Sequence, residues 1–275
     1  MTLREIATAA EAPYGVSIVD GEVWTTLVRA SALVSLTGAR IELPPGGSAP
    51  MVMSGPWFGA SLDTGHGPRG ALGRVGAEAL VDVGGSVYGV AAAGGSVWFS
   101  DMATDRLGVL REDDPSRARY VDLPPGGFPA AVSVGPDGVV WCALNRAGAV
   151  AKVVGSSVTV VPLPMAQAGP VGVCAVQGGA WVVVIDTGHL VFVTATGLVR
   201  PIPLPDQAAK PHAVVVDGLD RVWFTEWGAS RVGVYADGAF THVDLPPGAE
   251  PHGLAVAEDG VWVACESGFL AHVTG

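Results

Sequence analysis

Two histidines follow prolines at equivalent points of a repeated pattern in the second half of the chain. His212 lies in KPHAVVV and His252 in EPHGLAV, and each histidine opens an apolar run. Glu250 comes directly before the second of these prolines, and Glu266 follows the run VWVAC. Two carboxylates and one histidine can hold a hard divalent cation, while the second histidine stays unbound as a general base. These residue types therefore indicate metal-assisted acid–base chemistry.

The choice of cation follows from the same donors. Mg²⁺ prefers shells made of oxygen atoms, whereas Mn²⁺ accepts a histidine ligand more readily. Either Mg²⁺ or another divalent cation such as Mn²⁺ is therefore the expected cofactor.

A single histidine at such a position is more often a turn residue that bonds its own backbone. Two equivalent histidines together with two carboxylates favour a site.

A repeat of about forty residues must position these side chains. Six runs such as DGVVWCA and LDRVWFT carry a tryptophan, and the last five are 39 to 43 residues apart: Trp98, Trp141, Trp181, Trp223 and Trp262. A proline usually stands eleven or twelve residues earlier, and many units end in DLP or PLP. A diverged further unit starts at Pro50 and includes Trp57 after a shortened first strand. Such a period is typical of solenoids and propellers.

Each unit predicts four short strands separated by Gly, Pro and Asp turns, and no comparable segment has a helical period. Seven units predict an all-β fold, a seven-bladed β-propeller of four-stranded antiparallel blades that takes up residues 1–275 as one domain. Because a propeller closes its ring to remove exposed edges, residues 3–8 are expected to supply the outer strand of the blade that contains Trp262. Separate β-sandwich domains are the alternative, but the repeat continues without linkers.

Propeller geometry predicts which residues meet at the channel, because the first strand of every blade lines it. The residue after the blade-opening proline then recurs around one rim: Tyr14, Met51, Tyr88, Ala130, Val171, His212 and His252. The residue four past each tryptophan forms a second ring in the later blades: Met102, Asn145, Ile185, Trp227 and Glu266. Polar chemistry converges on the last two blades and the first, which are neighbours in a closed ring. We therefore expect both histidines and both glutamates to lie together, with Tyr14 across the seam.

Composition narrows the classes of partner. The net charge of −11 argues against nucleic acids and anionic membranes. No apolar run reaches the roughly 18 residues of a membrane span, and the first residues do not form a signal peptide. The three cysteines have no metal-type spacing and are expected to be buried, reduced thiols: Cys142, Cys174 and Cys265. We expect a cytoplasmic monomer that acts on a small molecule.

The last two blades and the first carry a family resemblance. KPHAVVVDGLDRVWFTEWGASRVG and AEPHGLAVAEDGVWVACE resemble the closing blades of the virginiamycin B lyases, which inactivate streptogramin B antibiotics. EAPYGVSIVDGEVWTT resembles their opening blade. The resemblance implies a seven-bladed propeller that linearises a cyclic depsipeptide by elimination and needs a divalent metal, usually magnesium. It also implies roles for six residues, namely metal-site residues His212, Glu250 and Glu266, general base His252, and substrate contacts Tyr14 and Trp227.

The two equivalent histidines need a feature that separates their roles. Glu250, beside the second one, is expected to break the symmetry, so that His212 binds the metal and His252 remains the base. Elimination from a threonine-derived ester removes the proton α to a carbonyl and expels a carboxylate from the β carbon. A neutral imidazole is basic enough for this step near pH 7, and we expect it to titrate near 6.5, lowered by the charge of the cation.

Three alternatives remain on the residues alone. Hydrolysis by metal-bound water would use the same side chains as elimination. A metal-dependent enzyme that acts on another lactone or ester is favoured by the divergent second blade. A non-catalytic propeller that binds a small molecule is the third, and the retention of this particular quartet of side chains argues against it.

Overall fold

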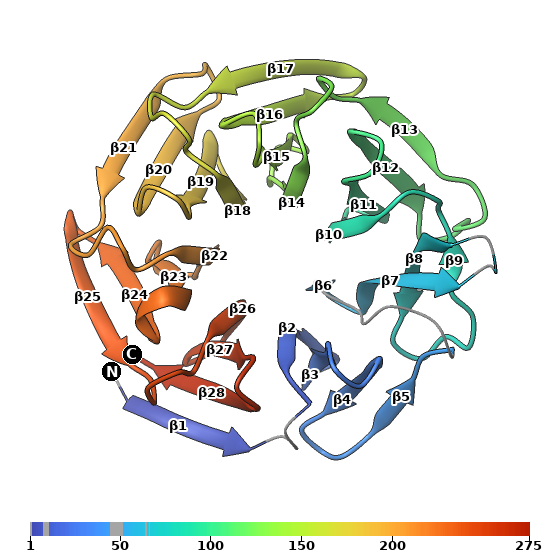
Figure 1. Ribbon diagram of the computed structural model, residues 1–275, viewed down its shortest axis with the longest axis horizontal. Helices are drawn as coiled ribbons and strands as arrows, with labels where there is room; N and C mark the ends of the chain where they lie inside the picture. The colour runs from blue at the N-terminus through green and yellow to red at the C-terminus, as the bar shows by residue number, and fades with distance from the viewer. Residues whose placement is uncertain (1, 8–10, 45–51, 64, 66) are drawn as a thin grey trace.

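The computed structural model describes residues 2–7, 11–44, 52–63, 65 and 67–275. Seven antiparallel sheets of four strands each surround a central channel (Figure 1). The predicted all-β, seven-bladed propeller is therefore confirmed. In every blade the strand nearest the channel is the first one, and later strands lie progressively farther out.

The blades are numbered here in chain order. Blades 1 to 3 contain β2 (Pro13–Val19), β3 (Glu22–Leu27), β4 (Ala32–Ser35), β5 (Arg40–Glu42); β6 (Met53–Ser54), β7 (Trp57–Asp63), β8 (Pro68–Arg74), β9 (Val81–Asp82); and β10 (Val87–Ala93), β11 (Ser96–Asp101), β12 (Arg106–Arg111), β13 (Arg119–Asp122). Blades 4 and 5 contain β14 (Pro129–Val134), β15 (Val140–Leu144), β16 (Ala149–Val154), β17 (Ser157–Pro162); and β18 (Pro170–Val176), β19 (Gly179–Val184), β20 (His189–Thr194), β21 (Val199–Pro203). Blades 6 and 7 contain β22 (Pro211–Val216), β23 (Val222–Glu226), β24 (Arg231–Ala236), β25 (Ala239–Asp244); and β26 (Pro251–Ala257), β27 (Gly260–Cys265), β28 (Phe269–Thr274), with β1 (Thr2–Ala7).

The N-terminal strand closes the ring. β1 pairs antiparallel with β28, with Thr2 opposite Thr274 and Ala7 opposite Phe269. This pairing confirms the outer strand predicted from residues 3–8, except that residue 8 lies outside the described residues. Closure of the ring makes blades 7 and 1 neighbours in space (Figure 1). Residues at the two ends of the chain can therefore contribute to one site.

Blade 2 differs from the others as its sequence predicted. Its first strand, β6, is only two residues long, and Trp57 starts the second strand. Trp57 packs with Phe99 and other buried residues of blade 3. The predicted blade start at Pro50 and the predicted rim residue Met51 lie outside the described residues.

The repeated tryptophans belong to the core. Trp141 and Trp223 are almost fully buried, and each packs against aliphatic side chains of the next blade. Cys142 and Cys265 are buried as predicted, whereas Cys174 is only partly buried. The one helical element in the described part of the chain, η1 (Trp227–Ala229), is a single 3-10 turn, and no described helix is long and apolar enough to span a membrane.

Glycines in the first strands set the width of the channel. A Cβ atom on Gly253 would lie 2.5 Å from the carbonyl oxygen of Tyr14, and one on Gly172 would lie 2.6 Å from that of His212. Neighbouring first strands can therefore come this close only because no side chain intervenes. The close approach brings the rim residues of different blades within reach of one another.

Candidate active site

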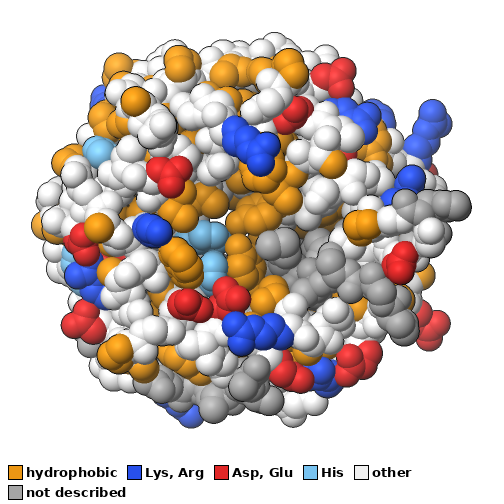
Figure 2. All heavy atoms as spheres, in the orientation of Figure 1, with side chains coloured by type: hydrophobic (Ala, Val, Ile, Leu, Met, Phe, Trp, Pro, Cys, Tyr) orange, Lys and Arg blue, Asp and Glu red, His pale blue; other side chains and the backbone are white. Residues whose placement is uncertain are grey.

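His212 and His252 are the second residues of the first strands of blades 6 and 7, each directly after the proline that begins the strand. Their rings are 4.6 Å apart between centroids and almost perpendicular, at 89°. Histidine side chains lie in the central hollow of one face of the ring, with acidic side chains beside them (Figure 2). The predicted meeting of the two histidines at the channel is therefore present in the structure.

Glu266 holds the second of these histidines. Its Oε2 atom lies 2.9 Å from Nε2 of His252. The position of Glu266 is set by the backbone, because its N–H donates to the carbonyl oxygen of Glu250 after β27 has ended. The His252 side chain is 8% exposed and that of Glu266 27% exposed, so the pair lies at the border between core and solvent.

Burial determines the charge of both imidazoles. Desolvation lowers the pKa of His252 to about 4. Desolvation, together with the nearby His252, lowers the pKa of His212 to about 3. Both rings are therefore neutral near pH 7. A downward shift of the pKa of His252 was expected from the charge of a cation, and burial by itself is enough to lower this pKa.

The tautomer of His252 follows from its partner. A carboxylate only accepts hydrogen bonds, so Nε2–H of the neutral ring donates to Glu266 and the lone pair lies on Nδ1. This Nδ1 atom is buried and has no hydrogen-bond partner among the described residues. A buried polar atom without a partner requires an explanation, and a proton-accepting role supplies one.

Tyr14 contacts both histidines. Its ring stacks on that of His252 with a centroid distance of 4.2 Å, and its hydroxyl oxygen is 3.3 Å from Nε2 of His212. Burial, the neighbouring Tyr88 and the charge of Glu266 raise the pKa of Tyr14, so it remains protonated. Its predicted place across the seam from the histidines is present in the structure.

Tyr88 is a site neighbour that the polar pattern of the last blades did not indicate. It belongs to blade 3, yet its hydroxyl oxygen lies 3.2 Å from that of Tyr14 and 3.5 Å from Nε2 of His212. The prediction that polar chemistry converges only on blades 6, 7 and 1 was therefore too narrow. The signal was available, because Tyr88 occupies the same rim position as the other three rings.

Trp227 lies at the edge of this cluster. Its ring centroid is 6.3 Å from that of His252, and it belongs to the 3-10 turn that follows β23. Nζ of Lys210 lies 5.2 Å from the centre of the Trp227 ring. The tryptophan therefore presents an aromatic surface next to the second histidine, as its second-ring position predicted.

Glu250 contributes a carboxylate with no partner. Among the described residues, its side chain makes no hydrogen bond or ion pair, and it is half-buried. Its backbone has a positive φ of 51°, which non-glycine residues rarely adopt. The equivalent residues Ala12, Phe128 and Lys210 have the same feature, so this φ is a property of the blade turn.

The donors suit an open metal site. Glu250 and Glu266 supply carboxylates and His212 an imidazole, which are ligand types that Mg²⁺ or Mn²⁺ accepts. Within the described part of the chain, no three His, Cys, Asp or Glu side chains are grouped closely enough to hold an ion by themselves. Mg²⁺ usually keeps several waters and uses one or two protein carboxylates. A cation held by Glu250, Glu266 or His212 would therefore need further ligands from water or substrate.

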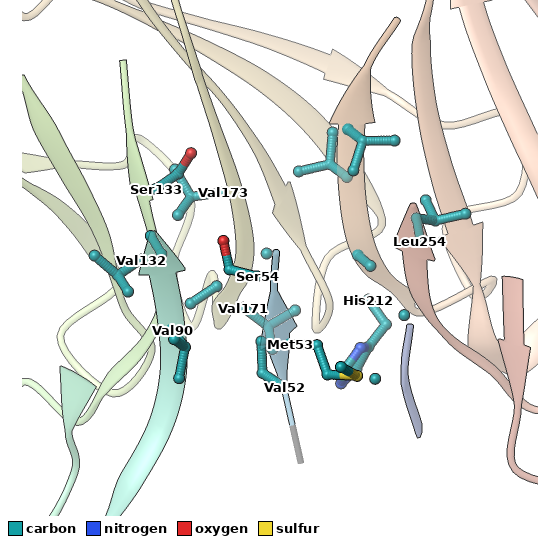
Figure 3. A pocket seen from close by; sticks show the side chains of 18 of the residues that line it. Val52, Met53, Ser54, Val90, Val132, Ser133, Val171, Val173, His212 and Leu254 are labelled. Atoms are coloured by element: carbon teal, nitrogen blue, oxygen red, sulfur yellow. The ribbon is translucent and has the colours of Figure 1, made fainter. Parts of the chain in front are cut away.

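An apolar cavity lies in the channel next to these side chains. It has a volume of about 200 Å³ and is lined by first strands of all seven blades. Figure 3 shows valine side chains and His212 pointing into this space. Tyr14, Tyr88 and His212 contribute polar atoms to its wall, whereas Val90, Val132 and similar residues make the remainder aliphatic.

Comparison with known proteins places this geometry in context. Residues 1–273 match the Virginiamycin B lyase family. A virginiamycin B lyase from Nocardia farcinica is 39% identical over 222 residues, which cover 78% of this chain and 77% of the relative. A streptogramin B lyase structure superposes with a TM-score of 0.86 at 24% identity, covering 100% of this chain and 98% of that chain, a likeness of fold.

A further solved structure carries a ligand. It is a catalytically inactive histidine-to-alanine variant of virginiamycin B lyase from Staphylococcus aureus with quinupristin. It superposes with a TM-score of 0.85 at 25% identity and covers 100% of this chain and 99% of that chain. From the family match over nearly its whole length and the similarity to the Nocardia protein, the chain belongs to the virginiamycin B lyase family.

Proposed function

We propose that the protein is a metal-dependent carbon–oxygen lyase that linearises a cyclic depsipeptide of the streptogramin B type by elimination at its ester bond. Family membership and the quinupristin-bound relative support the substrate class. The observation that carries the proposal is the neutral His252 ring, held by Glu266 and stacked on Tyr14 in the central hollow. In the Staphylococcus relative, replacing one histidine is enough to abolish catalysis.

The reaction requires one proton acceptor. Nδ1 of His252 takes the proton from the carbon α to the carbonyl, and the electrons of that C–H bond form the new Cα=Cβ double bond. The Cβ–O bond breaks, and its electrons leave with the carboxylate. The product is a linear peptide with a dehydrobutyrine residue and a free carboxylate, and no water is consumed. A positioned base of this kind contributes roughly 10²–10⁴ in rate.

Glu266 assists the base after the proton has moved. The imidazolium that forms keeps its Nε2–H bond to the carboxylate, which now joins two opposite charges. Such bonds contribute about 1.5–3 kcal/mol, which offsets part of the desolvation that lowers the pKa of His252. Nδ1 is buried, and the rings of Tyr14 and Trp227 lie at centroid distances of 4.2 Å and 6.3 Å from that of His252, so a substrate bound at His252 would approach beside them. These rings would then contact the substrate.

Glu250, Glu266 and His212 would hold the divalent cation. When bound, the cation polarises a substrate oxygen and thereby makes the α-proton more acidic. The half-buried Glu250 carboxylate, which has no partner among the described residues, is the donor most readily available to it.

The decisive experiment is mass spectrometry of a streptogramin B antibiotic incubated with the protein and Mg²⁺. Elimination leaves the mass unchanged, whereas hydrolysis adds one water. We expect a ring-opened product of unchanged mass, and its disappearance after treatment with EDTA. A product heavier by one water, or full activity without metal, would refute the proposal.

Substitution of the two histidines separates their roles. His252→Ala should lower kcat by at least about 10²-fold and leave Mn²⁺ affinity nearly unchanged, because the base is not a ligand. His212→Ala should weaken Mn²⁺ binding. His189→Ala, on β20 of blade 5, is the matched control and should retain both properties. If His252→Ala loses the metal and regains turnover in excess Mn²⁺, the roles are reversed.

Blade 2 supports a second candidate, an enzyme of the same chemistry that acts on a different cyclic ester. The first strand of that blade has only two residues, so the wall of the channel there differs from that of the other blades. A panel of lactones and depsipeptides would distinguish the candidates. Turnover of another ester with no action on streptogramin B would favour this one.

A further inference from the structure

We propose that Tyr88 is a positioning residue of the active site. Its hydroxyl group holds His212 and Tyr14 in what we call the hydroxyl triangle, the three polar atoms of Tyr14, Tyr88 and His212. The consequence for turnover depends on the proposed function, whereas the effect on the His212 ring does not.

The hydroxyl triangle joins three blades that are not paired with one another. Tyr14 lies in blade 1, Tyr88 in blade 3 and His212 in blade 6, so the contacts cross the channel. The two hydroxyl oxygens are 3.2 Å apart, and they lie 3.3 Å and 3.5 Å from Nε2 of His212. Among the described strands, no sheet pairing links these blades, so the side-chain contacts connect these three groups across the channel.

The protonation states of the three groups define the hydrogen bonds that Tyr88 can make. Burial raises the pKa of Tyr88, so this hydroxyl is protonated, as is that of Tyr14. His212 is neutral, so Nε2 either accepts from a hydroxyl group or donates to one. Two hydroxyl groups beside one ring nitrogen form a connected chain of hydrogen bonds, which holds the orientation of the ring and, through the cooperativity of the chain, favours one tautomer. Without the Tyr88 hydroxyl, Tyr14 is the one hydroxyl partner left to His212 among the described residues.

Neighbouring hydroxyl groups are already engaged elsewhere. Ser54 and Ser133 also line the cavity, but their oxygen atoms accept the backbone N–H groups of Ala92 and Ala175. The rest of the nearby wall is largely aliphatic, as Figure 3 shows. A side chain that could replace the Tyr88 hydroxyl is therefore absent from the described lining of the cavity.

Tyr88→Phe tests the role, because it removes one oxygen atom and keeps the ring. We expect kcat to fall about tenfold, the loss of one buried hydrogen bond, while KM changes less than about twofold. Nitrogen-15 histidine NMR should show one His212 tautomer in the natural protein and a mixture of both in the variant. The His212 signal is assigned by its absence from His212→Ala. Tyr235→Phe is the matched control, because Tyr235 packs on Trp181 and Phe240 away from the channel.

Five outcomes test the proposal. A lower kcat with a mixed His212 tautomer supports the proposal, and so does a double variant with Tyr14→Phe whose loss is smaller than the product of the single losses. An unchanged tautomer refutes it, whether or not kcat falls, because a general structural effect would then be the cause. An unchanged kcat with a mixed tautomer refutes the role in turnover. If the natural protein does not act on the antibiotic, the proposed function fails, and the NMR result alone decides whether Tyr88 positions His212.

Discussion

Acid should destabilise the protein through its two channel histidines. In the folded state their pKa values are lowered to about 3 for His212 and about 4 for His252, compared with 6.5 for an unperturbed histidine. Between these values the unfolded chain binds protons that the folded chain does not bind. The free energy of unfolding therefore rises with pH in this window and falls as the pH is lowered from 6.5 towards 4.

The size of the effect follows from the shifts. Each unit of pH within the window changes the free energy of unfolding by up to about 1.4 kcal/mol per histidine. Between pH 6.5 and 4.5, where protonation of the unfolded chain rises from half to nearly complete, each histidine should cost about 2 kcal/mol. Both rings together should therefore cost roughly 4 kcal/mol, a large share of the stability of an ordinary domain.

Urea unfolding followed by tryptophan fluorescence at pH 6.5, 5.5 and 4.5 measures this cost. The natural protein is compared with the double variant His212→Gln, His252→Gln, in which neither position titrates. Carboxylates that do not contact the two histidines titrate alike in both proteins and cancel in the comparison, and His189→Gln serves as the control. An equal loss of stability in the natural protein and the double variant would show that the histidines are not buried as neutral rings. A difference of about half the expected size would show that the charge of Glu266, 2.9 Å away, keeps His252 protonated.

Three further predictions concern backbone and closure. Glu250→Gly should raise the free energy of unfolding by about 1 kcal/mol, because it relieves a positive φ of 51°. The same variant should weaken Mn²⁺ binding. Lys210→Gly, at a residue with the same φ of 51°, should give the gain in stability alone in thermal melts. Gly253→Ala should cost about 1–3 kcal/mol and lower turnover, since its Cβ atom would lie 2.5 Å from the carbonyl oxygen of Tyr14; normal kinetics and melting would contradict this. Removal of residues 2–7 should expose the edge of β28 and cause aggregation visible by light scattering, and a monodisperse, fully stable product would show that closure is dispensable.

The repeat made most of the fold predictable. Tryptophans at a period of about forty residues fixed the number of blades, and the position after each blade-opening residue identified Tyr14, His212 and His252 as rim residues. Even the shortened first strand of blade 2 was visible around Trp57. Tyr88 shares their rim position, but the 3.2 Å approach of its hydroxyl oxygen to that of Tyr14 depends on the channel width. The channel width depends on close approaches between neighbouring first strands, such as that of Gly253 to the carbonyl oxygen of Tyr14. The repeat in the sequence does not predict these distances.

The structure also changes the reason why the two histidines differ. Glu250 was expected to break their symmetry, but the carboxylate that contacts a histidine is that of Glu266, at the second-ring position where blade 6 has Trp227. The ring of His252 therefore faces an acceptor that can stabilise a proton on it. The ring of His212 faces two protonated hydroxyl groups and the other imidazole, none of which stabilises a positive charge to a comparable degree. A base must carry its proton for part of each turnover, so the second ring favours His252 as the base and leaves His212 as the neutral ring suited to a metal.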